Sequence, residues 1–178
     1  MIKPQLTHVG LYVDDLVQMR RFYSEVFGLT VTDAGGPPDF HLDMVFMSAN
    51  PNEHHQVVLV AGRPDTATAN VAQQISFLVN SLDEMREMRD KVVAEGLTVH
   101  RVATHGNAWS FYFNDPEGNT LEIYVHTPWY IPQPTGVPFD LDQSNEEIMA
   151  QTEALCQSKD GFISAADRKA NMADMIGA

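Results

Sequence analysis

The sequence has a single cysteine, few basic residues and no long apolar run. Cys156 is the only cysteine among 178 residues, so no disulfide can form within the chain. Eleven Lys and Arg stand against 24 Asp and Glu, a net charge of -13 that repels nucleic acid and anionic membranes. No stretch is long enough to cross a bilayer, and the first residues do not resemble a signal peptide. We therefore expect a cytoplasmic protein whose partners are small molecules.

A repeat organises the first two thirds of the chain. Residues 7–31 and 73–99 follow one plan, and both contain Gly-Leu-Thr-Val at their end. In each copy an alternating strand leads into a polar pair and then into a helix with apolar residues at helical spacing. The polar pairs, Asp14-Asp15 and Asn80-Ser81, predict the starts of the two helices, since Asp, Asn and Ser are favoured N-caps.

Three predicted strands follow each predicted helix. They cover about residues 29–33, 41–48 and 55–61 in the first copy, and 97–103, 108–114 and 120–126 in the second. The sequence therefore predicts an α+β fold of two βαβββ modules, over about residues 5–62 and 72–126. A four-stranded sheet with one helix leaves its other face bare, so we expect the two sheets to curl into one open barrel with the helices outside.

The composition changes after the second module. Residues 1–128 are expected to form the main domain, and residues 129–178 a C-terminal extension with two short helices. Their predicted caps are Ser144 with Glu147 and Ser164 with Asp167. The extension could pack along the barrel, over the mouth of a cleft or across a homodimer, and the sequence does not choose among these.

Strand alternation predicts which residues face the interior of the barrel. In the first strand the set His8, Gly10 and Tyr12 alternates with an apolar set, and in the last strand Thr120, Glu122 and Tyr124 do the same. A carboxylate in the middle of a strand is costly to bury without a compensating partner. That partner is either a hydrogen-bonded imidazole or a metal ion.

The repeat favours the metal ion. Position 8 corresponds to Gln74 in the second copy, and position 122 corresponds to 55 or 56 in the first, where His55 and Gln56 stand. Polar residues at all these related inward positions are hard to explain by core packing. We therefore expect a metal-centred barrel, with His8 and Glu122 as ligands suited to first-row divalent metals.

The βαβββ duplication with His8, Gln74 and Glu122 resembles the vicinal oxygen chelate superfamily. This superfamily includes glyoxalases, extradiol ring-cleaving dioxygenases and bleomycin-resistance proteins, and the resemblance covers about residues 5–126. Two local patterns are most similar to the extradiol dioxygenases. They are the run from Glu53 to Val57, which contains His54-His55, and the run from His105 to Tyr112, followed ten residues later by Glu122.

The resemblance implies a site and a reaction. It implies His8, Gln74 and Glu122 as metal ligands, although Gln74 stands where the family has a second His. It implies His55, His105 and Tyr112 as catalytic residues around the substrate. The implied metal is Fe(II), with Mn, Zn and Ni as alternatives. The implied activity is that of a non-haem extradiol-type dioxygenase, which cleaves a catechol-like aromatic diol with O2.

Other functions fit parts of the same pattern. A glyoxalase-like lyase or isomerase would use Glu122 as a base and would not need O2. A binding protein of the bleomycin-resistance kind would line its cleft with these residues and hold no metal. At the level of single residues, His55 could be a surface residue, His105 a turn residue and Tyr112 part of the core.

Overall fold

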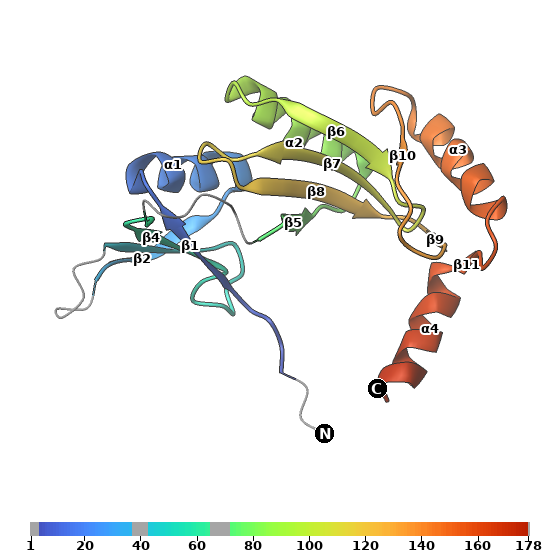
Figure 1. Cartoon of the computed structure of the whole chain (residues 1–178), viewed down its shortest axis with the longest axis horizontal. Coiled ribbons are helices and arrows are strands. Elements are labelled where there is room, and N and C mark those ends of the chain that lie inside the picture. The colour runs from blue at the N-terminus through green and yellow to red at the C-terminus, as the bar shows by residue number, and fades with distance from the viewer. Residues whose placement is uncertain (1–3, 37–42, 65–71, 178) are drawn as a thin grey trace. The chain divides into compact units, whose positions relative to one another are not determined.

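Each copy of the repeat folds into its own sheet (Figure 1). The structure, a computed structural model, describes residues 4–36, 43–64 and 72–177. Within these ranges the strand orders are β1-β4-β3-β2 in a four-stranded sheet and β10-β6-β7-β8-β5 in a five-stranded sheet. Both are open sheets and neither is a closed barrel. The α+β class with two βαβββ modules is confirmed.

The elements follow in chain order. They are β1 (Val9–Val13), α1 (Leu16–Phe27), β2 (Thr30–Gly35), β3 (Met44–Ser48), β4 (Val57–Ala61), β5 (Ile75–Leu78), α2 (Leu82–Ala94), β6 (Val99–Thr104), β7 (Ala108–Asn114), β8 (Thr120–His126), β9 (Trp129–Tyr130), β10 (Val137–Pro138), α3 (Asn145–Gln157), β11 (Ile163–Ser164) and α4 (Ala165–Ile176). No helix in the described ranges has the length and apolar character that a membrane crossing requires.

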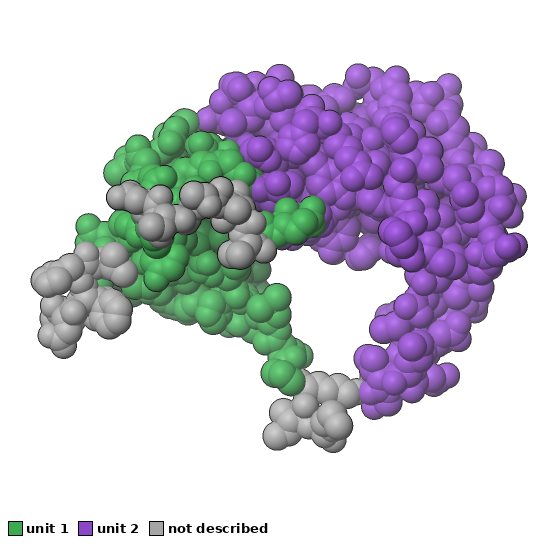
Figure 2. Space-filling model, viewed as in Figure 1, with its two compact units in different colours: residues 1–73, 115–119 green, residues 74–114, 120–178 purple. Residues whose placement is uncertain are grey.

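The chain divides into two compact units (Figure 2). The first unit holds residues 1–73 together with 115–119, and the second holds residues 74–114 and 120–178. The turn between β7 and β8 therefore belongs to the first unit, although both of its strands belong to the second. The C-terminal extension belongs entirely to the second unit.

The predicted strands agree best with the structure in the second copy. Strands β7 and β8 begin and end at the predicted residues. In the first copy β2 continues through Ala34 and Gly35, two residues beyond its predicted end, because these residues pair with β3 beyond a register shift after Val31. The predicted start of β3 at residue 41 lies outside the described residues.

Both repeat helices begin at the predicted caps, and each buries an apolar stripe. The Asp15 side chain accepts a hydrogen bond from Gln18 N at the start of α1, and the Ser81 side chain accepts one from Glu84 N at the start of α2. The buried residues are Met19, Phe22, Tyr23 and Val26 in α1, and Leu82, Met85 and Val92 in α2. Each helix thus covers one face of its own sheet with an apolar stripe.

The strand registers correct the predicted correspondence between the copies. In the second sheet Glu122 lies opposite Ser76, and the matching pair in the first sheet is Gly10 with Val58. The position equivalent to Glu122 is therefore apolar, and the predicted match to residue 55 or 56 is wrong. The error arose because β4 begins at Val57, two residues later than predicted. The first copy thus carries no counterpart of the Glu122 carboxylate.

The turn after β7 is held to the first unit by two carboxylates. Asp115 is 3% exposed, and its carboxylate accepts hydrogen bonds from the main-chain N–H groups of Glu117 and Asn119. It also accepts bonds from Asn119 Nδ2 at 2.8 Å and from the Tyr23 hydroxyl at 3.3 Å. Burial raises the pKa of Asp115. Four donors thus depend on this carboxylate.

Glu117 places a second carboxylate at the start of α1. Its side chain accepts from the main-chain N–H groups of Asp14 and Asp15 at 2.8–2.9 Å. Arg63 lies 3.8 Å away and also donates to the Glu117 main-chain oxygen. A negative charge is favourable at a helix N-terminus, where main-chain N–H groups lack partners. The turn therefore supplies hydrogen-bond acceptors for the main-chain N–H groups just before α1.

The C-terminal extension packs within the second unit. Arg86 of α2 donates to the main-chain oxygens of Leu141 and Gln143 at 2.7 Å. Trp109 of β7 donates from Nε1 to the buried Thr152 hydroxyl of α3 at 2.8 Å. In addition, β10 extends the sheet by pairing with β6. The extension thus covers α2 and the β6–β7 side of its own sheet.

The predicted caps of α3 and α4 are confirmed, and one of them is expected to respond to pH. Ser144 and Glu147 form a reciprocal capping box, and the Ser144 side chain accepts from Glu147 N. Ser164 caps α4 in the same way, through Asp167 N. The hydrogen bonds from Ser144 lower the pKa of the exposed Glu147.

Glu147→Gln is expected to flatten the pH dependence of stability on the acid side. Because the folded pKa is depressed, Glu147 stabilises the fold above its unfolded pKa and loses that contribution as the pH falls through the folded value. Gln can still cap the helix but cannot titrate. Urea midpoints of the two proteins between about pH 6 and about pH 3 measure this. A gap that stays constant with pH would contradict it.

Candidate metal and substrate site

The predicted site residues are divided between the two units. The first unit contains His8 and His55, and the second contains Gln74, His105, Tyr112 and Glu122. Each group forms a connected cluster of its own, and the two clusters have different chemistry. The second cluster is built around a carboxylate and the first around imidazole rings.

Glu122 is the centre of the second cluster. Its side chain leaves the middle of β8, and the residue is 7% exposed. Oε2 accepts from Gln74 Nε2 at 2.6 Å and from Ser76 Oγ at 2.5 Å, and Oε1 accepts from the Tyr112 hydroxyl at 2.6 Å. Three neutral donors therefore compensate the buried carboxylate. Since a carboxylate offers about four acceptor positions, it can still bind a cation.

Gln74 is oriented by the same carboxylate. Its amide nitrogen donates to Glu122 and also to Ser76 Oγ at 3.0 Å. Because a carboxylate can only accept, the nitrogen of the amide must face Glu122, and both of its hydrogens are in use. Oε1 of Gln74 is therefore the atom that can act as a ligand. An amide oxygen is a harder ligand than an imidazole nitrogen.

Tyr112 and His105 extend the network across the sheet. Tyr112 of β7 lies opposite Glu122 of β8, and the Tyr112 hydroxyl is 2.8 Å from His105 Nε2. His105 Nδ1 lies 2.5 Å from the main-chain oxygen of Thr135. A carbonyl only accepts, so Nδ1 must be the donor of that bond. The continuous chain from His105 through Tyr112 to Glu122 can pass a proton by changing which partner donates.

Tyr112 remains a phenol at physiological pH. Burial, followed by the bond and the charge of Glu122, raises the pKa of Tyr112 to about 12, against the smaller opposite effects of Ser110 and Arg101. The hydroxyl is therefore a donor to Glu122. The position of Tyr112 within this chain distinguishes it from a core tyrosine whose hydroxyl is satisfied by main chain.

The loop that carries His105 is fixed by the C-terminal extension. Gln133 donates from Nε2 to the His105 main-chain oxygen at 2.7 Å, and its Oε1 accepts from Thr135 N at 3.0 Å. Gly106 follows with a φ of +79°, and a Cβ there would lie 2.5 Å from the Ile131 side chain. His105 is thus a turn residue whose ring is also held in a defined direction.

The first cluster pairs His8 with His55. Their ring centroids are 4.4 Å apart, and the His55 ring lies 5.2 Å from that of Phe46. Gln56 turns away, since its Oε1 accepts from Ala49 N at 3.0 Å. Partial burial, and then the charges of His8 and His54, lower the pKa of His55. Of the two residues that alternation left open, His55 is the one beside His8.

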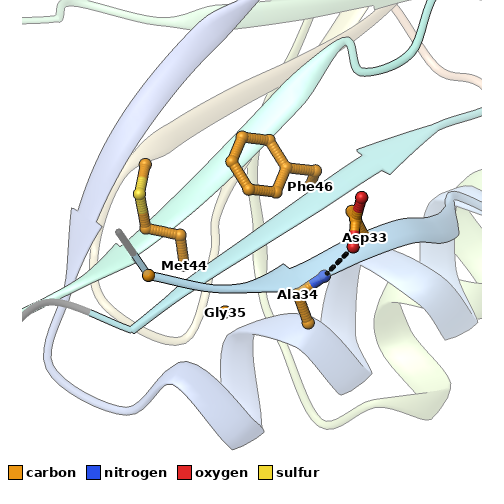
Figure 3. A pocket seen from close by; sticks show the side chains of 6 residues that line it. Asp33, Ala34, Gly35, Met44 and Phe46 are labelled. Carbon is orange, nitrogen blue, oxygen red and sulfur yellow. Dashed lines mark hydrogen bonds between the residues drawn. The ribbon is translucent and has the colours of Figure 1, made fainter. Parts of the chain in front are cut away.

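A shallow pocket lies beside this pair on the first unit (Figure 3). It is lined by Phe46 and Met44 of β3 and by their register partners on the neighbouring strand β2, Asp33 and Gly35. The Phe46 ring thus contacts His55 and also lines the pocket. An apolar floor beside an imidazole ring suits a flat organic ring.

The metal set remains a prediction. Among the described residues no three or more His, Cys, Asp and Glu side chains gather as one ligand group. The predicted set contains only two of these residue types, His8 and Glu122, and they lie in different units. The donor chemistry nevertheless fits a divalent metal, because Glu122 keeps acceptor capacity and Gln74 has an available oxygen.

Sequence reasoning missed three contributors to the second cluster. Ser76 lies two residues after Gln74 on the same side of the chain, so strand alternation could have found it. Arg101 lies opposite Tyr112 on the neighbouring strand β6. Thr135 acts through its main-chain oxygen, and no pattern of side chains predicts such a contact.

Known proteins resemble the chain over this region. A family profile described as the "Glyoxalase/Bleomycin resistance protein/Dioxygenase superfamily" matches residues 5–123. Biphenyl-2,3-diol 1,2-dioxygenase 3 of Rhodococcus globerulus is 28% identical over 133 residues, which cover 70% of this chain and 64% of the relative. Biphenyl-2,3-diol 1,2-dioxygenase 2 of the same organism is 25% identical over 77% of each chain. The chain thus spans less than two thirds of the first of these relatives.

Solved structures share the fold at lower identity. A glyoxylase/bleomycin resistance protein/dioxygenase domain from Frankia sp. EAN1pec has a TM-score of 0.61 at 18% identity, covering 71% of this chain and all of that one. The fosfomycin resistance protein FosX of Listeria monocytogenes, solved with Mn(II) and 1S,2S-dihydroxypropylphosphonic acid, has a TM-score of 0.57 at 20% identity. That match covers 71% of this chain and 93% of FosX.

Proposed function

The chain belongs to the glyoxalase/bleomycin resistance protein/dioxygenase superfamily, and on that premise we propose that it is an extradiol-type dioxygenase. It would open a catechol-like aromatic ring with O2. The observation that carries the proposal is the hydrogen-bonded chain from His105 through Tyr112 to Glu122. Relatives described as biphenyl-diol dioxygenases support the same class of reaction.

The proposal assigns His8, Gln74 and Glu122 as the ligands of one divalent metal. Fe(II), when bound, would supply a site at which the two oxygens of a diol and O2 meet and exchange electrons. Glu122 would contribute an oxygen while Tyr112 and Ser76 hold its direction. Gln74 would contribute Oε1, because its nitrogen is engaged by Glu122.

The remaining residues would bind the diol and move its protons. The Tyr112 hydroxyl, whose one proton is donated to Glu122, would accept a hydrogen bond from a substrate hydroxyl. His105 would receive a proton through Tyr112 at Nε2, while Thr135 keeps its Nδ1 proton in place. His55 would serve as a proton donor or acceptor toward oxygen, since the nitrogens of an imidazole can act in either role. Phe46 would support the aromatic ring.

Oxygen uptake tests this proposal directly. The protein is loaded with Fe(II) without oxygen and is then mixed with O2 and a panel of catechols. We expect at least one catechol to be consumed with an equal amount of O2, giving a product whose ring is opened next to the diol. Resorcinol, whose hydroxyls are not vicinal, is the matched control and should not react. No uptake across the panel sinks the ring-cleavage proposal.

A metal-dependent lyase or isomerase is the second candidate. It is favoured by Gln74, whose hard amide oxygen suits a metal that does no redox chemistry. In that case Glu122 would move a proton and O2 would not be needed. Loading with Mn(II) or Zn(II) under anaerobic conditions separates the two, because turnover without O2 is expected only of the second candidate. A metal-free binding protein would instead keep its ligand affinity after His8→Ala.

A further inference from the structure

We propose that Arg101 binds an anionic group of the substrate, which makes the substrate a catechol-like diol that carries a carboxylate. This rests on the proposed function and narrows its substrate class. Arg101 lies on β6, and its register partner on β7 is Tyr112. Directly opposite residues of neighbouring strands project to the same side of a sheet. Arg101 therefore emerges on the side of the sheet that carries Tyr112 and Glu122.

The guanidinium is placed beside the phenol ring. Its Cζ atom lies 5.4 Å from the Tyr112 ring centroid, within the range of a cation–π contact. This contact orients the group without using its N–H donors. The five donors of a guanidinium form a planar fork that matches the two oxygens of a carboxylate.

Arg101 is not neutralised by a neighbouring acid. It makes no ion pair with any described residue, whereas Arg86 and Arg89 in the same unit pair with Asp83 and Asp142. Glu122, the buried carboxylate of the site, is satisfied by three neutral donors. A free cation is notable in a chain with 11 basic and 24 acidic residues.

The C-terminal extension preserves room for this cation. A Cβ at Gly136 would lie 2.5 Å from Arg101 Nη2 and 3.7 Å from His105 Cε1. Glycine at 136 thus lets the guanidinium and the His105 ring lie against the same short stretch of main chain. Arg101 is thereby brought next to both residues proposed to hold the diol, His105 and Tyr112.

The net charge of the chain explains why a local cation would be needed. A protein of charge -13 repels an anionic ligand over several ångströms, so a site for such a ligand requires compensating positive charge. A lysine ammonium would also supply a positive charge, but only the arginine guanidinium offers two parallel N–H donors for the two oxygens of a carboxylate. The pairing of Arg101 with a carboxylate satisfies both requirements.

The test compares two probes that differ only in charge. The probes are 3,4-dihydroxybenzoate and its neutral amide, 3,4-dihydroxybenzamide, assayed for kcat and KM with the Fe(II)-loaded protein. We expect the native protein to prefer the benzoate by about tenfold or more in kcat/KM. Arg101→Met should remove that preference mainly by raising KM for the benzoate, and Arg101→Lys should retain part of it.

Two further variants separate charge from position. Arg168 of α4 lies over the Tyr130 ring at 4.5 Å, so Arg168→Met removes a similar cation–π contact elsewhere in the unit and should leave the preference unchanged. Gly136→Ala keeps the charge of Arg101 but displaces its guanidinium, which is the movable end of a flexible side chain. It should weaken the preference in the same direction as Arg101→Met.

Binding measurements keep this inference separate from the proposed function. Calorimetry of both probes is done without oxygen on the native and Arg101→Met proteins. If no diol consumes O2 but the benzoate binds more tightly than the amide and loses that advantage in Arg101→Met, the dioxygenase proposal fails and the anion site stands. If the native protein binds the two probes equally, or Arg101→Met keeps the preference, the anion site is overturned.

Discussion

Glu122→Gln is expected to lower kcat/KM for the diol by a factor of about 100 to 1,000 and to reduce the bound metal. Gln has one acceptor oxygen in place of two, and its NH2 group would face donors. The native carboxylate accepts from Gln74, Ser76 and Tyr112 at 2.5–2.6 Å, so at least one of these donors would lose its partner. The metal content per chain and the O2 uptake rate together measure the effect.

The control for this prediction is Glu153→Gln on α3. It makes the same chemical change in the second unit, at an exposed residue that accepts a hydrogen bond from Gln157 at 3.3 Å. This variant should bind metal and react as the native protein does. If Glu122→Gln retains native metal content and rate, Glu122 is neither a ligand nor part of the reaction.

Asp115→Ala is expected to destabilise the protein by about 3 kcal/mol. The substitution leaves two main-chain N–H groups, the Asn119 amide and the Tyr23 hydroxyl without an acceptor at a residue that is 3% exposed. Each buried donor left unpaired costs about 1–3 kcal/mol, and local rearrangement toward water recovers part of the sum. The loss of a charge whose burial is itself costly offsets a further part.

Urea unfolding measures this loss, and two variants sharpen it. Asp115→Asn keeps the size of the side chain and one acceptor oxygen, so its destabilisation should lie between those of the native and Ala proteins. Asp174→Ala changes an exposed carboxylate near the end of α4 and should shift the midpoint little. An Asp115→Ala midpoint equal to that of Asp174→Ala would show that the Asp115 carboxylate does not stabilise the fold.

The local parts of this structure were predictable from the sequence. Alternation over 108–114 and 120–126 defined two strands to the residue, and Ser144 with Glu147 defined a helix start. These features depend on neighbours within one or two turns of chain, so their signals lie close together in the sequence. The same alternation put Glu122 on the polar face of its strand.

The tertiary parts were not predictable in the same way. The correspondence between copies depended on where β4 begins, and a shift of two residues changed a presumed polar partner into Val58. The role of Arg101 depends on its register with β7 and on Gly136, which lies 35 positions further along the chain. Thr135 contributes a main-chain atom, which carries no signature of residue type. Sequence patterns predict which residues share one face of a strand or helix. Which strand residues lie opposite one another, and which distant segments meet, is seen only in the structure.

The turn after β7 also constrains the order in which the protein can be made. The first copy ends near residue 61, but the main-chain N–H groups of Asp14 and Asp15 at the start of α1 find their acceptor in Glu117, in the middle of the second copy. During synthesis the first unit therefore cannot be completed until residues 115–119 have left the ribosome. Expressed alone, a fragment that stops after the first copy would lack Asp115 under Tyr23 and Glu117 at the helix start. The two copies, although recognisable as repeats in the sequence, are therefore not independent of each other in the folded protein.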